Sequence, residues 1–252
     1  MKFWKYTSAG NDFVVFDNVL NLQNDEIARI CDRRFGIGAD GVLIFKDSDR
    51  LDFEMIYYNA DGGEVEMCGN GARALCHFAR NVKNIKQATL KFQTQNGEYN
   101  SDFLDDGTIR MKMSEISIGG VPTDNLFDGK ISYIEVGVPH IVLFDVSFSK
   151  EIAKNIRHDS RFTNGVNVNF VKSLGQDKYE VRTFERGVED ETLACGTGIT
   201  AVGVGLLSSN TDASVEILSR GGEFKVEKKG EDYFLTGPTE LVFEGEIELE
   251  QR

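Results

Sequence analysis

Several features that mark particular protein classes are scarce or missing in this sequence. The four cysteines in 252 residues are too few for the disulfide scaffold of a small secreted domain. No stretch approaches the roughly 18 to 20 consecutive apolar residues of a membrane span, and residues 1–11 lack a basic run followed by an apolar segment. We therefore expect free thiols, no membrane association and a cytoplasmic protein.

Basic residues are also in deficit. Lys and Arg number 28 against 41 Asp and Glu, which leaves a net charge of −13. Such a surface repels phosphate backbones and anionic lipid, so nucleic acid is excluded as an expected partner. Only 3 prolines accompany 26 glycines, a balance that predicts few rigid linkers and many close backbone approaches. With 40% hydrophobic and 27% charged residues, the chain is typical of a globular protein with a packed core.

The sequence contains an internal repeat. A shift of 127 residues aligns the two halves of the chain in order, and near the ends of the halves a shift of 125 continues the register. The identities at the first shift include Gly10 with Gly137, Asp32 with Asp159, Arg34-Phe35 with Arg161-Phe162, Gly38 with Gly165, Glu64 with Glu191, Cys68-Gly69 with Cys195-Gly196, and Gly71 with Gly198. The chain is therefore interpreted as a duplicated lobe.

Each copy follows one order of elements: strand, short helix, two strands, a longer helix and closing strands. The expected helices span residues 25–33 and 69–81 in the first copy, and 151–158 and 196–208 in the second. The expected strands are rich in β-branched and aromatic residues and span 13–17, 42–45, 51–58, 90–94, 108–113, 141–145, 166–171, 179–184, 215–219, 233–236 and 241–250. This order predicts an α+β fold of two pseudo-symmetric lobes, each a curved, mostly antiparallel sheet or barrel around a central helix. We expect an N-terminal lobe over residues 1–117, a C-terminal lobe over 118–241, and a last strand within 242–252 that packs on the first lobe.

Each copy places a cysteine, Cys68 or Cys195, directly before its longer helix and follows it with Gly-x-Gly. A helix N-terminus offers unsatisfied N–H groups and the positive end of a dipole, which can lower a thiol pKa from about 8.5 toward roughly 3.5 to 7.5. The glycines allow a small anion such as a carboxylate to approach the same N–H groups. A single cysteine is usually a buried structural residue. Here a cysteine recurs at the same point of both repeats, which favours a catalytic role.

Two such thiols suit inversion of a stereocentre. If the lobes pack with pseudo-twofold symmetry, the sulfurs face each other across a cleft, one as the base that removes a proton and the other as the acid that returns one to the opposite face. Contact distances of roughly 3 to 3.5 Å on each side place the sulfurs about 6 to 7 Å apart. That separation is too long for a disulfide without closure of the cleft.

Other interpretations of the cysteines have less support. The three histidines, His77, His140 and His158, form no cluster with metal-ligand spacing, so no metal site is expected. No dinucleotide-binding glycine motif, Walker lysine or Gly-x-Ser-x-Gly elbow occurs. A non-catalytic amino-acid-binding protein and a thiol redox sensor stay open as alternatives from another class, although a pure binder would need neither sulfur.

At these residues the chain resembles the diaminopimelate epimerase family along essentially its full length. The resemblance rests on Ala9-Gly10-Asn11-Asp12-Phe13, Asn59-Ala60-Asp61-Gly62, Cys68-Gly69-Asn70-Gly71-Ala72-Arg73, Pro139-His140, Glu185-Arg186-Gly187 and Ala194-Cys195-Gly196-Thr197-Gly198. It implies an isomerase that interconverts LL- and meso-2,6-diaminopimelate in lysine and peptidoglycan precursor synthesis. It also implies no cofactor, no metal and a homodimer.

The resemblance assigns roles by position. Cys68 and Cys195 match the catalytic acid and base, and His140 and Glu185 match positions that tune the thiols. The substrate-binding positions are Asn11, Asn59, Gly69, Asn70, Asn167, Glu185, Arg186, Gly196 and Thr197.

Three departures from the family pattern bear on specificity. Thr7-Ser8 and Gly41 differ from residues that are frequent in the family, and Val138 replaces the polar residue that usually precedes Pro-His. The reaction centre is unaffected, but one polar contact to substrate is lost. A racemase of another amino acid with the same two-cysteine mechanism therefore stays open as the alternative enzyme.

Overall fold

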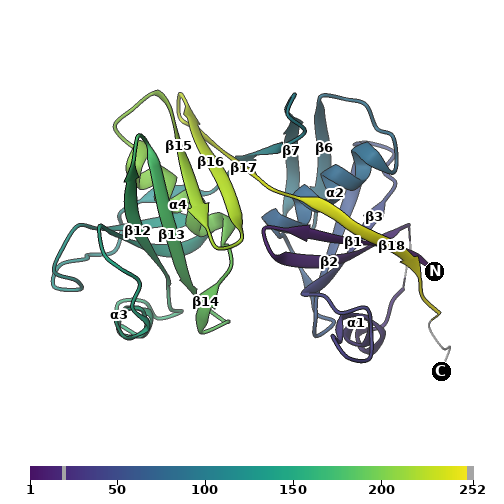
Figure 1. The fold of residues 1–252 in the computed structure, drawn as a ribbon, viewed down its shortest axis with the longest axis horizontal. Coiled ribbons are helices and arrows are strands. Elements are labelled where there is room, and N and C mark those ends of the chain that lie inside the picture. Colours follow the sequence, from purple (N-terminus) through teal and green to yellow (C-terminus); the bar gives the residue numbers. More distant parts are fainter. Residues whose placement is uncertain (19–20, 249–252) are drawn as a thin grey trace. The chain divides into compact units, whose positions relative to one another are not determined.

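The computed structural model describes residues 1–18 and 21–248, and the chain divides into two compact units (Figure 1). The first unit comprises Met1–Met111 together with the segment that begins at Pro238, and the second comprises Lys112–Gly237. The sequence places the first boundary after residue 117 instead. The difference arises because strand β9 (Ile116–Ile118) pairs with β10 (Ile131–Val136), which lies in the second unit.

The C-terminal segment returns to the first unit. Strand β18 (Glu240–Glu246) pairs antiparallel with β1 (Lys2–Ser8), and it begins one residue before the expected strand 241–250. Residues 249–252 of the predicted terminal segment lie outside the described residues. The first unit is therefore built from both ends of the sequence.

The first unit holds two helices and nine strands among its described residues. Besides β1 and β18 these are β2 (Asn11–Asp17), α1 (Asn24–Cys31), β3 (Gly41–Lys46), β4 (Phe53–Asn59), β5 (Glu64–Val65), α2 (Gly69–Asn81), β6 (Thr89–Thr94), β7 (Gly97–Phe103) and β8 (Ile109–Met113). Strand β2 is parallel to β3 and β4 is parallel to β6, whereas β1 with β2, β3 with β4, β4 with β5, β6 with β7 and β7 with β8 are antiparallel.

The second unit repeats this topology. After β9 and β10 it contains β11 (Val138–Phe144), α3 (Lys150–Arg157), β12 (Asn167–Gly175), β13 (Lys178–Glu185), β14 (Asp190–Thr192), α4 (Gly196–Leu207), β15 (Asp212–Ser219), β16 (Gly222–Lys229) and β17 (Asp232–Gly237). Strand β11 is parallel to β12 and β13 is parallel to β15, while β10 with β11, β12 with β13, β13 with β14, β15 with β16 and β16 with β17 are antiparallel. The predicted α+β class and the predicted duplication are confirmed.

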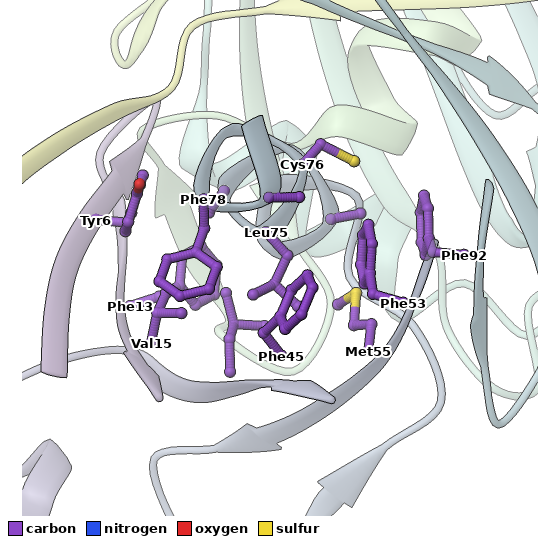
Figure 2. Close-up of a cluster of buried hydrophobic side chains, with 14 of the residues drawn as sticks. Tyr6, Phe13, Val15, Phe45, Phe53, Met55, Leu75, Cys76, Phe78 and Phe92 are labelled. Atoms are coloured by element: carbon purple, nitrogen blue, oxygen red, sulfur yellow. The ribbon is translucent and has the colours of Figure 1, made fainter. Parts of the chain in front are cut away.

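The long helix of each unit is apolar because it is packed inside its sheet. In the first unit, side chains of α2 such as Leu75 and Phe78 are fully buried among Phe45, Phe53 and Phe92 of the strands (Figure 2). Burying an aromatic or aliphatic side chain of this size contributes roughly 1.5 to 3 kcal/mol. Helix α4 is apolar around most of its circumference, and a Cβ at Gly203 would come within 2.3 Å of Val226 on β16, so that helix and strand are in close contact.

Both long helices begin where the sequence predicts. Cys68 and Cys195 are the N-cap residues of α2 and α4, with extended backbones of φ −140°, ψ 115° and φ −117°, ψ 108°. An extended residue before the first helical turn directs its side chain toward the free N–H groups of that turn. The two thiols therefore occupy equivalent positions in their units.

Candidate active site

In the first unit, the sulfur of Cys68 lies against the start of α2. The backbone N–H of Gly71 donates to Sγ over 3.4 Å. A Cβ at Gly71 would come within 2.9 Å of the Leu43 side chain, so the glycine lets the first turn of α2 pack closely on β3. The thiol is half-buried at the N-terminus of α2, where the positive end of the helix dipole lies.

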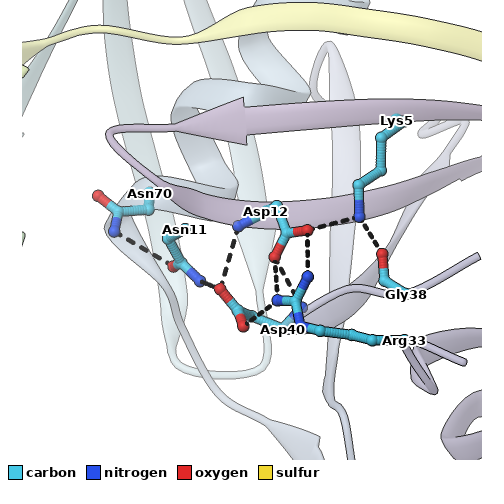
Figure 3. A network of polar contacts seen from close by, with 7 residues as sticks. All are labelled: Lys5, Asn11, Asp12, Arg33, Gly38, Asp40 and Asn70. Atoms are coloured by element: carbon cyan, nitrogen blue, oxygen red, sulfur yellow. Dashed lines mark hydrogen bonds and ion pairs between the residues drawn. The ribbon is translucent and has the colours of Figure 1, made fainter. Parts of the chain in front are cut away.

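Two asparagines surround this sulfur. The Cys68 thiol donates to Asn11 Oδ1 at 4.0 Å. The same oxygen accepts a hydrogen bond of 3.2 Å from Asn70 Nδ2 (Figure 3). Asn11 Nδ2 donates in turn to Asp40 Oδ2 at 2.8 Å. A carboxylate only accepts, so Asp40 decides which end of the Asn11 amide faces the sulfur. The structure thus gathers Asn11, Cys68 and Asn70 in one cluster.

An ion-pair network holds Asp40 in place (Figure 3). Arg33 bridges Asp12 at 2.7 Å and Asp40 at 2.8 Å, and Lys5 binds Asp12 at 2.7 Å as well as the carbonyl of Gly38. Burial opposes ionisation of Asp12, but hydrogen bonds from Arg33 and Lys5 prevail and lower its pKa to about 2. Asp12 is therefore ionised at neutral pH and fixes the strand that carries Asn11.

The remaining predicted residues near the start of α2 are less closely joined to one another. Arg73, fully buried on α2, donates to Asn70 Oδ1 over 2.5 Å and so fixes the amide that contacts Asn11. Asn59, at the end of β4, accepts a hydrogen bond of 2.9 Å from the hydroxyl of Tyr57. Gly69 has open space where a Cβ would stand, so its backbone is accessible at the helix start.

In the second unit, Cys195 is more deeply buried than Cys68, with 7% of its surface exposed. Its sulfur lies 3.4 Å from Thr197 Oγ1. Burial raises the pKa of this thiol to about 12, and the nearby Glu185 carboxylate adds to the shift, while hydrogen bonds from Thr197 and Gly198 oppose it. Burial also raises the pKa of Glu185 itself, against the effect of Thr192. At neutral pH Cys195 is a protonated thiol.

Asn167 and Arg186 are brought together in this unit. The Arg186 backbone N–H donates to Asn167 Oδ1 at 2.8 Å, and Asn167 Nδ2 donates to the carbonyl of Pro139 at 3.3 Å. The Arg186 guanidinium reaches the carbonyl of Asn164 at 3.3 Å. The loop that follows β13 is thereby tied to β11 and β12.

His140 is completely buried beside a second asparagine that the site prediction omits. Asn169 Nδ2 lies 3.2 Å from His140 Nδ1, and Asn169 Oδ1 accepts a hydrogen bond of 2.9 Å from Thr183. Burial lowers the pKa of His140 to about 3, and the nearby Arg186 acts in the same direction. His140 is therefore neutral at physiological pH.

Sequence reasoning missed the residues that support those it found, namely Arg33, Asp40, Tyr57, Arg73, Asn169 and Thr183. A signal was present for Asn169, because it follows Asn167 by two residues and both interrupt the apolar run Val166–Val171. Residues two apart on a strand share a face, so two buried amides on one face indicate a polar site. For Asp40 and Arg33 no such pattern exists, because charged residues in loops are ordinarily solvated.

The burial of Cys195 predicts slow alkylation. Because its pKa is raised to about 12, we expect iodoacetamide to modify Cys195 in the native protein at least ~10³-fold more slowly than in the urea-unfolded chain, where the pKa is about 8.5. The half-buried Cys68 should react first. Peptide mapping by mass spectrometry after timed quenching measures both rates at pH 7 and pH 9. Equal labelling of both cysteines in the native protein at pH 7 would contradict the assignment.

Neither a metal cluster nor a membrane helix is found in the described part of the chain. Within residues 1–18 and 21–248, no group of three or more His, Cys, Asp or Glu side chains has a metal-binding arrangement. No helix in those ranges combines the length and the hydropathy needed to cross a bilayer.

Comparison with solved structures defines the class of fold. The phenazine biosynthesis protein of the PhzF family from Bacillus anthracis matches with a TM-score of 0.76 at 15% identity, covering 99% of each chain. A hydroxyproline epimerase from Agrobacterium vitis matches with a TM-score of 0.66 at 14% identity, covering 97% of this chain and 91% of that one. By its fold, the protein belongs with these α+β proteins.

Sequence comparison identifies the family. The family model described as diaminopimelate epimerase matches residues 3–118 and 132–242. The diaminopimelate epimerase of Campylobacter lari is 39% identical over 254 residues, with 98% of each chain covered, and that of Flavobacterium psychrophilum is 37% identical over 263 residues, with 98% of this chain and 100% of that protein covered. The chain belongs to the diaminopimelate epimerase family, which confirms the resemblance, and it is an isomerase.

Proposed function

We propose that this protein interconverts LL- and meso-2,6-diaminopimelate by removing the proton from one α carbon and returning a proton to the opposite face. One cysteine acts as the thiolate base and the other as the thiol acid, and their roles exchange in the reverse reaction. The observation that carries this proposal is the repetition of a cysteine N-cap at the start of the long helix in both units. Full-length similarity to diaminopimelate epimerases supports the substrate.

The two half-sites suggest how the roles are divided. Cys195, with its pKa raised to about 12, enters the reaction as the acid. In the direction of the reaction in which Cys195 is the acid, Cys68 is the base, because the reaction needs one thiol and one thiolate. The N–H donor from Gly71 to Cys68 supports this assignment because it stabilises negative charge on that sulfur.

The other predicted residues bind the substrate in this proposal. The N–H groups at Gly69-Asn70 and at Gly196-Thr197 open the two helices and suit the carboxylate of the reacting centre. Asn11, Asn59, Asn167 and the pair Glu185-Arg186 recognise ammonium and carboxylate groups. His140 and Glu185 tune the charge at the second half-site. The reaction proceeds with these side chains alone, without a cofactor or a metal.

Proton–deuterium exchange tests this function. With LL-diaminopimelate in heavy water, we expect one deuterium to enter at an α carbon as meso-diaminopimelate appears, and proton NMR follows both. L-Proline and L-lysine, which lack the second amino-acid centre, serve as control substrates and should show at least ~100-fold less exchange, because they lack contacts at the distal end. Exchange with a monoamino acid but none with diaminopimelate would instead favour a racemase, an alternative that Val138 keeps open.

We further propose a homodimer in the cytoplasm. Three consecutive side chains of β18, Leu241, Val242 and Phe243, expose 38 to 55% of their surfaces, and an apolar strand of this kind favours a protein contact. The family resemblance supports both expectations.

A further inference from the structure

Helix α4 begins over a buried polar cluster that has no counterpart in the first unit. Its members are His140 on β11, Asn169 on β12 and Thr183 on β13, with exposed fractions of 0%, 0% and 4%. In the second unit, Asn169 pairs with Val142 on β11 and with Thr183 on β13. In the first unit, Leu43 pairs with Val15 on β2 and with Tyr57 on β4, so Leu43 occupies the position equivalent to Asn169.

The equivalent positions of the first unit are filled by Phe13, Leu43 and Tyr57, which belong to its hydrophobic core. The same topology is thus stable with mostly apolar side chains at these positions. Burying His, Asn and Thr instead carries a desolvation cost that the fold does not require. The polar cluster therefore points to a role beyond packing at the start of α4.

The hydrogen bonds of Asn169 determine the tautomer of His140. Asn169 Nδ2 lies 3.0 Å from the carbonyl oxygen of Ile141, which only accepts, so this end of the amide is the NH₂ group. The same nitrogen lies 3.2 Å from His140 Nδ1. Its second hydrogen is directed to that ring nitrogen, so Nδ1 is an acceptor. The Thr183 hydroxyl donates to Oδ1 at 2.9 Å and agrees with this orientation.

A neutral imidazole whose Nδ1 accepts must carry its proton on Nε2. Among the described residues, Nε2 is buried without a hydrogen-bond partner. An unsatisfied buried donor destabilises the fold, so its retention is explained by an acceptor that arrives with the ligand. A proton added to Nδ1 would confront the Asn169 NH₂ group, which agrees with the lowered pKa of the ring.

We propose that Asn169 is a positioning residue that holds His140 as a neutral Nε2–H donor. In this state His140 stabilises negative charge on a bound or reacting group by donating a hydrogen bond, and it does not serve as a base that takes up a proton. The proposal rests on the proposed epimerase function for the identity of the reaction, and it adds the direction in which His140 acts.

The position of α4 depends on the same amide. A Cβ at Gly198, in the first turn of α4, would lie 2.4 Å from Asn169 Oδ1 and 3.3 Å from Thr183 Oγ1. The helix start that carries Cys195 therefore rests directly on the Asn169 side chain. Asn169 thus determines both the tautomer of His140 and the position of the start of α4.

NMR of the protein labelled with ¹⁵N in its histidine rings tests the proposal directly. The chain has three histidines, and the signals of His140 are assigned by their loss in His140→Gln. At pH 7 we expect long-range proton–nitrogen correlations to show a protonated Nε2 and an unprotonated Nδ1 for this ring. A protonated Nδ1, a charged ring or a mixture of tautomers in the wild-type protein would overturn the proposal.

Two variants separate positioning from mere packing. Leucine has the branched outline of asparagine and occupies the equivalent position in the first unit, so Asn169→Leu removes the donor to Nδ1 at similar volume. We expect the Nδ1–H tautomer to become populated and kcat to fall ~10- to 100-fold, with KM changed less than kcat, because a misplaced group costs this much in the transition state. Thr183→Val, the control, removes a hydroxyl from the same cluster but leaves Ile141 to orient the amide, so the wild-type tautomer should persist.

The NMR tautomer and the Cα exchange rate test the positioning role of Asn169 and the epimerase function separately. The tautomer is observed without substrate, so the NMR result stands even if diaminopimelate shows no Cα exchange. An unchanged tautomer in Asn169→Leu would refute the positioning role even in an active epimerase. If Asn169→Leu does not fold, the wild-type and Thr183→Val spectra still decide the tautomer.

Discussion

Replacing either Cys68 or Cys195 with serine should lower kcat for epimerisation by ~10²- to 10⁴-fold, the contribution usually made by one general acid or base. A serine hydroxyl is close to the thiol in size, but its pKa is far above the working pH, so neither a base nor a matched acid remains in the altered half-site. The measurement is the initial rate of conversion of LL- to meso-diaminopimelate by each purified variant.

The single variants should also separate exchange from inversion. In the variant that keeps the thiol facing the α proton of the starting isomer, that thiol can remove the proton and return deuterium to the same face, so exchange of this isomer should fall less than its inversion. The other variant lacks the base for this isomer and should lose both. Both rates come from one proton NMR time course in heavy water. Equal losses of exchange and inversion in both variants would mean that the thiols do not act on opposite faces.

The other two cysteines provide matched controls. Cys31 and Cys76 are buried, and the thiol of Cys76 donates to Ser101 Oγ at 3.2 Å. Cys31→Ala and Cys76→Ala should reduce stability by ~1 kcal/mol or more through the cavities they create but leave kcat within about twofold, since catalysis is not expected to depend on buried structural thiols. Wild-type kcat in a Cys68 or Cys195 variant would remove the catalytic assignment.

Gly198→Ala should lower kcat by ~10²-fold while the protein stays folded. The added methyl would lie 2.4 Å from Asn169 Oδ1, and that oxygen cannot move easily because Thr183, Ile141 and His140 all bind the same amide. Forcing extra volume into such a site costs ~1 to 3 kcal/mol. The helix start then shifts, and a displacement of about 1 Å at a catalytic group can cost ~10²-fold in rate.

The equivalent substitution in the first unit is the control. At Gly71 the nearest atom to an added Cβ is a methyl carbon of Leu43, at 2.9 Å, which is the flexible end of a side chain. Gly71→Ala should therefore destabilise the protein less than Gly198→Ala in thermal unfolding followed by circular dichroism. Gly69→Ala, where a Cβ meets nothing within 4 Å, should leave the melting temperature unchanged or raise it slightly. A larger loss of stability at Gly71 than at Gly198 would contradict this account.

Much of the secondary structure is accessible from the sequence. Helix α2 begins and ends at the predicted residues, Gly69 and Asn81, because its Cys-Gly-Asn-Gly start and its apolar spacing are local signals. Strands β1, β5, β7, β9, β10, β14 and β16 are absent from the sequence assignment. In β16, buried and exposed residues alternate, but charged residues such as Lys225 and Glu227 dilute the apolar signal. Such strands form because a neighbour supplies the hydrogen bonds.

The features of the candidate site also fall into two groups, those that the sequence indicates and those that only the folded chain brings together. The duplication, the paired cysteines and their place at helix starts are properties of the sequence itself, because they depend on residue identity and local order. Only the tertiary structure decides that Asp40 orients Asn11, that Asn169 sets the tautomer of His140 and that burial keeps Cys195 protonated. Each of these effects joins residues from different strands and loops, and hydrogen-bond direction and desolvation depend on distances that exist only after the chain has folded.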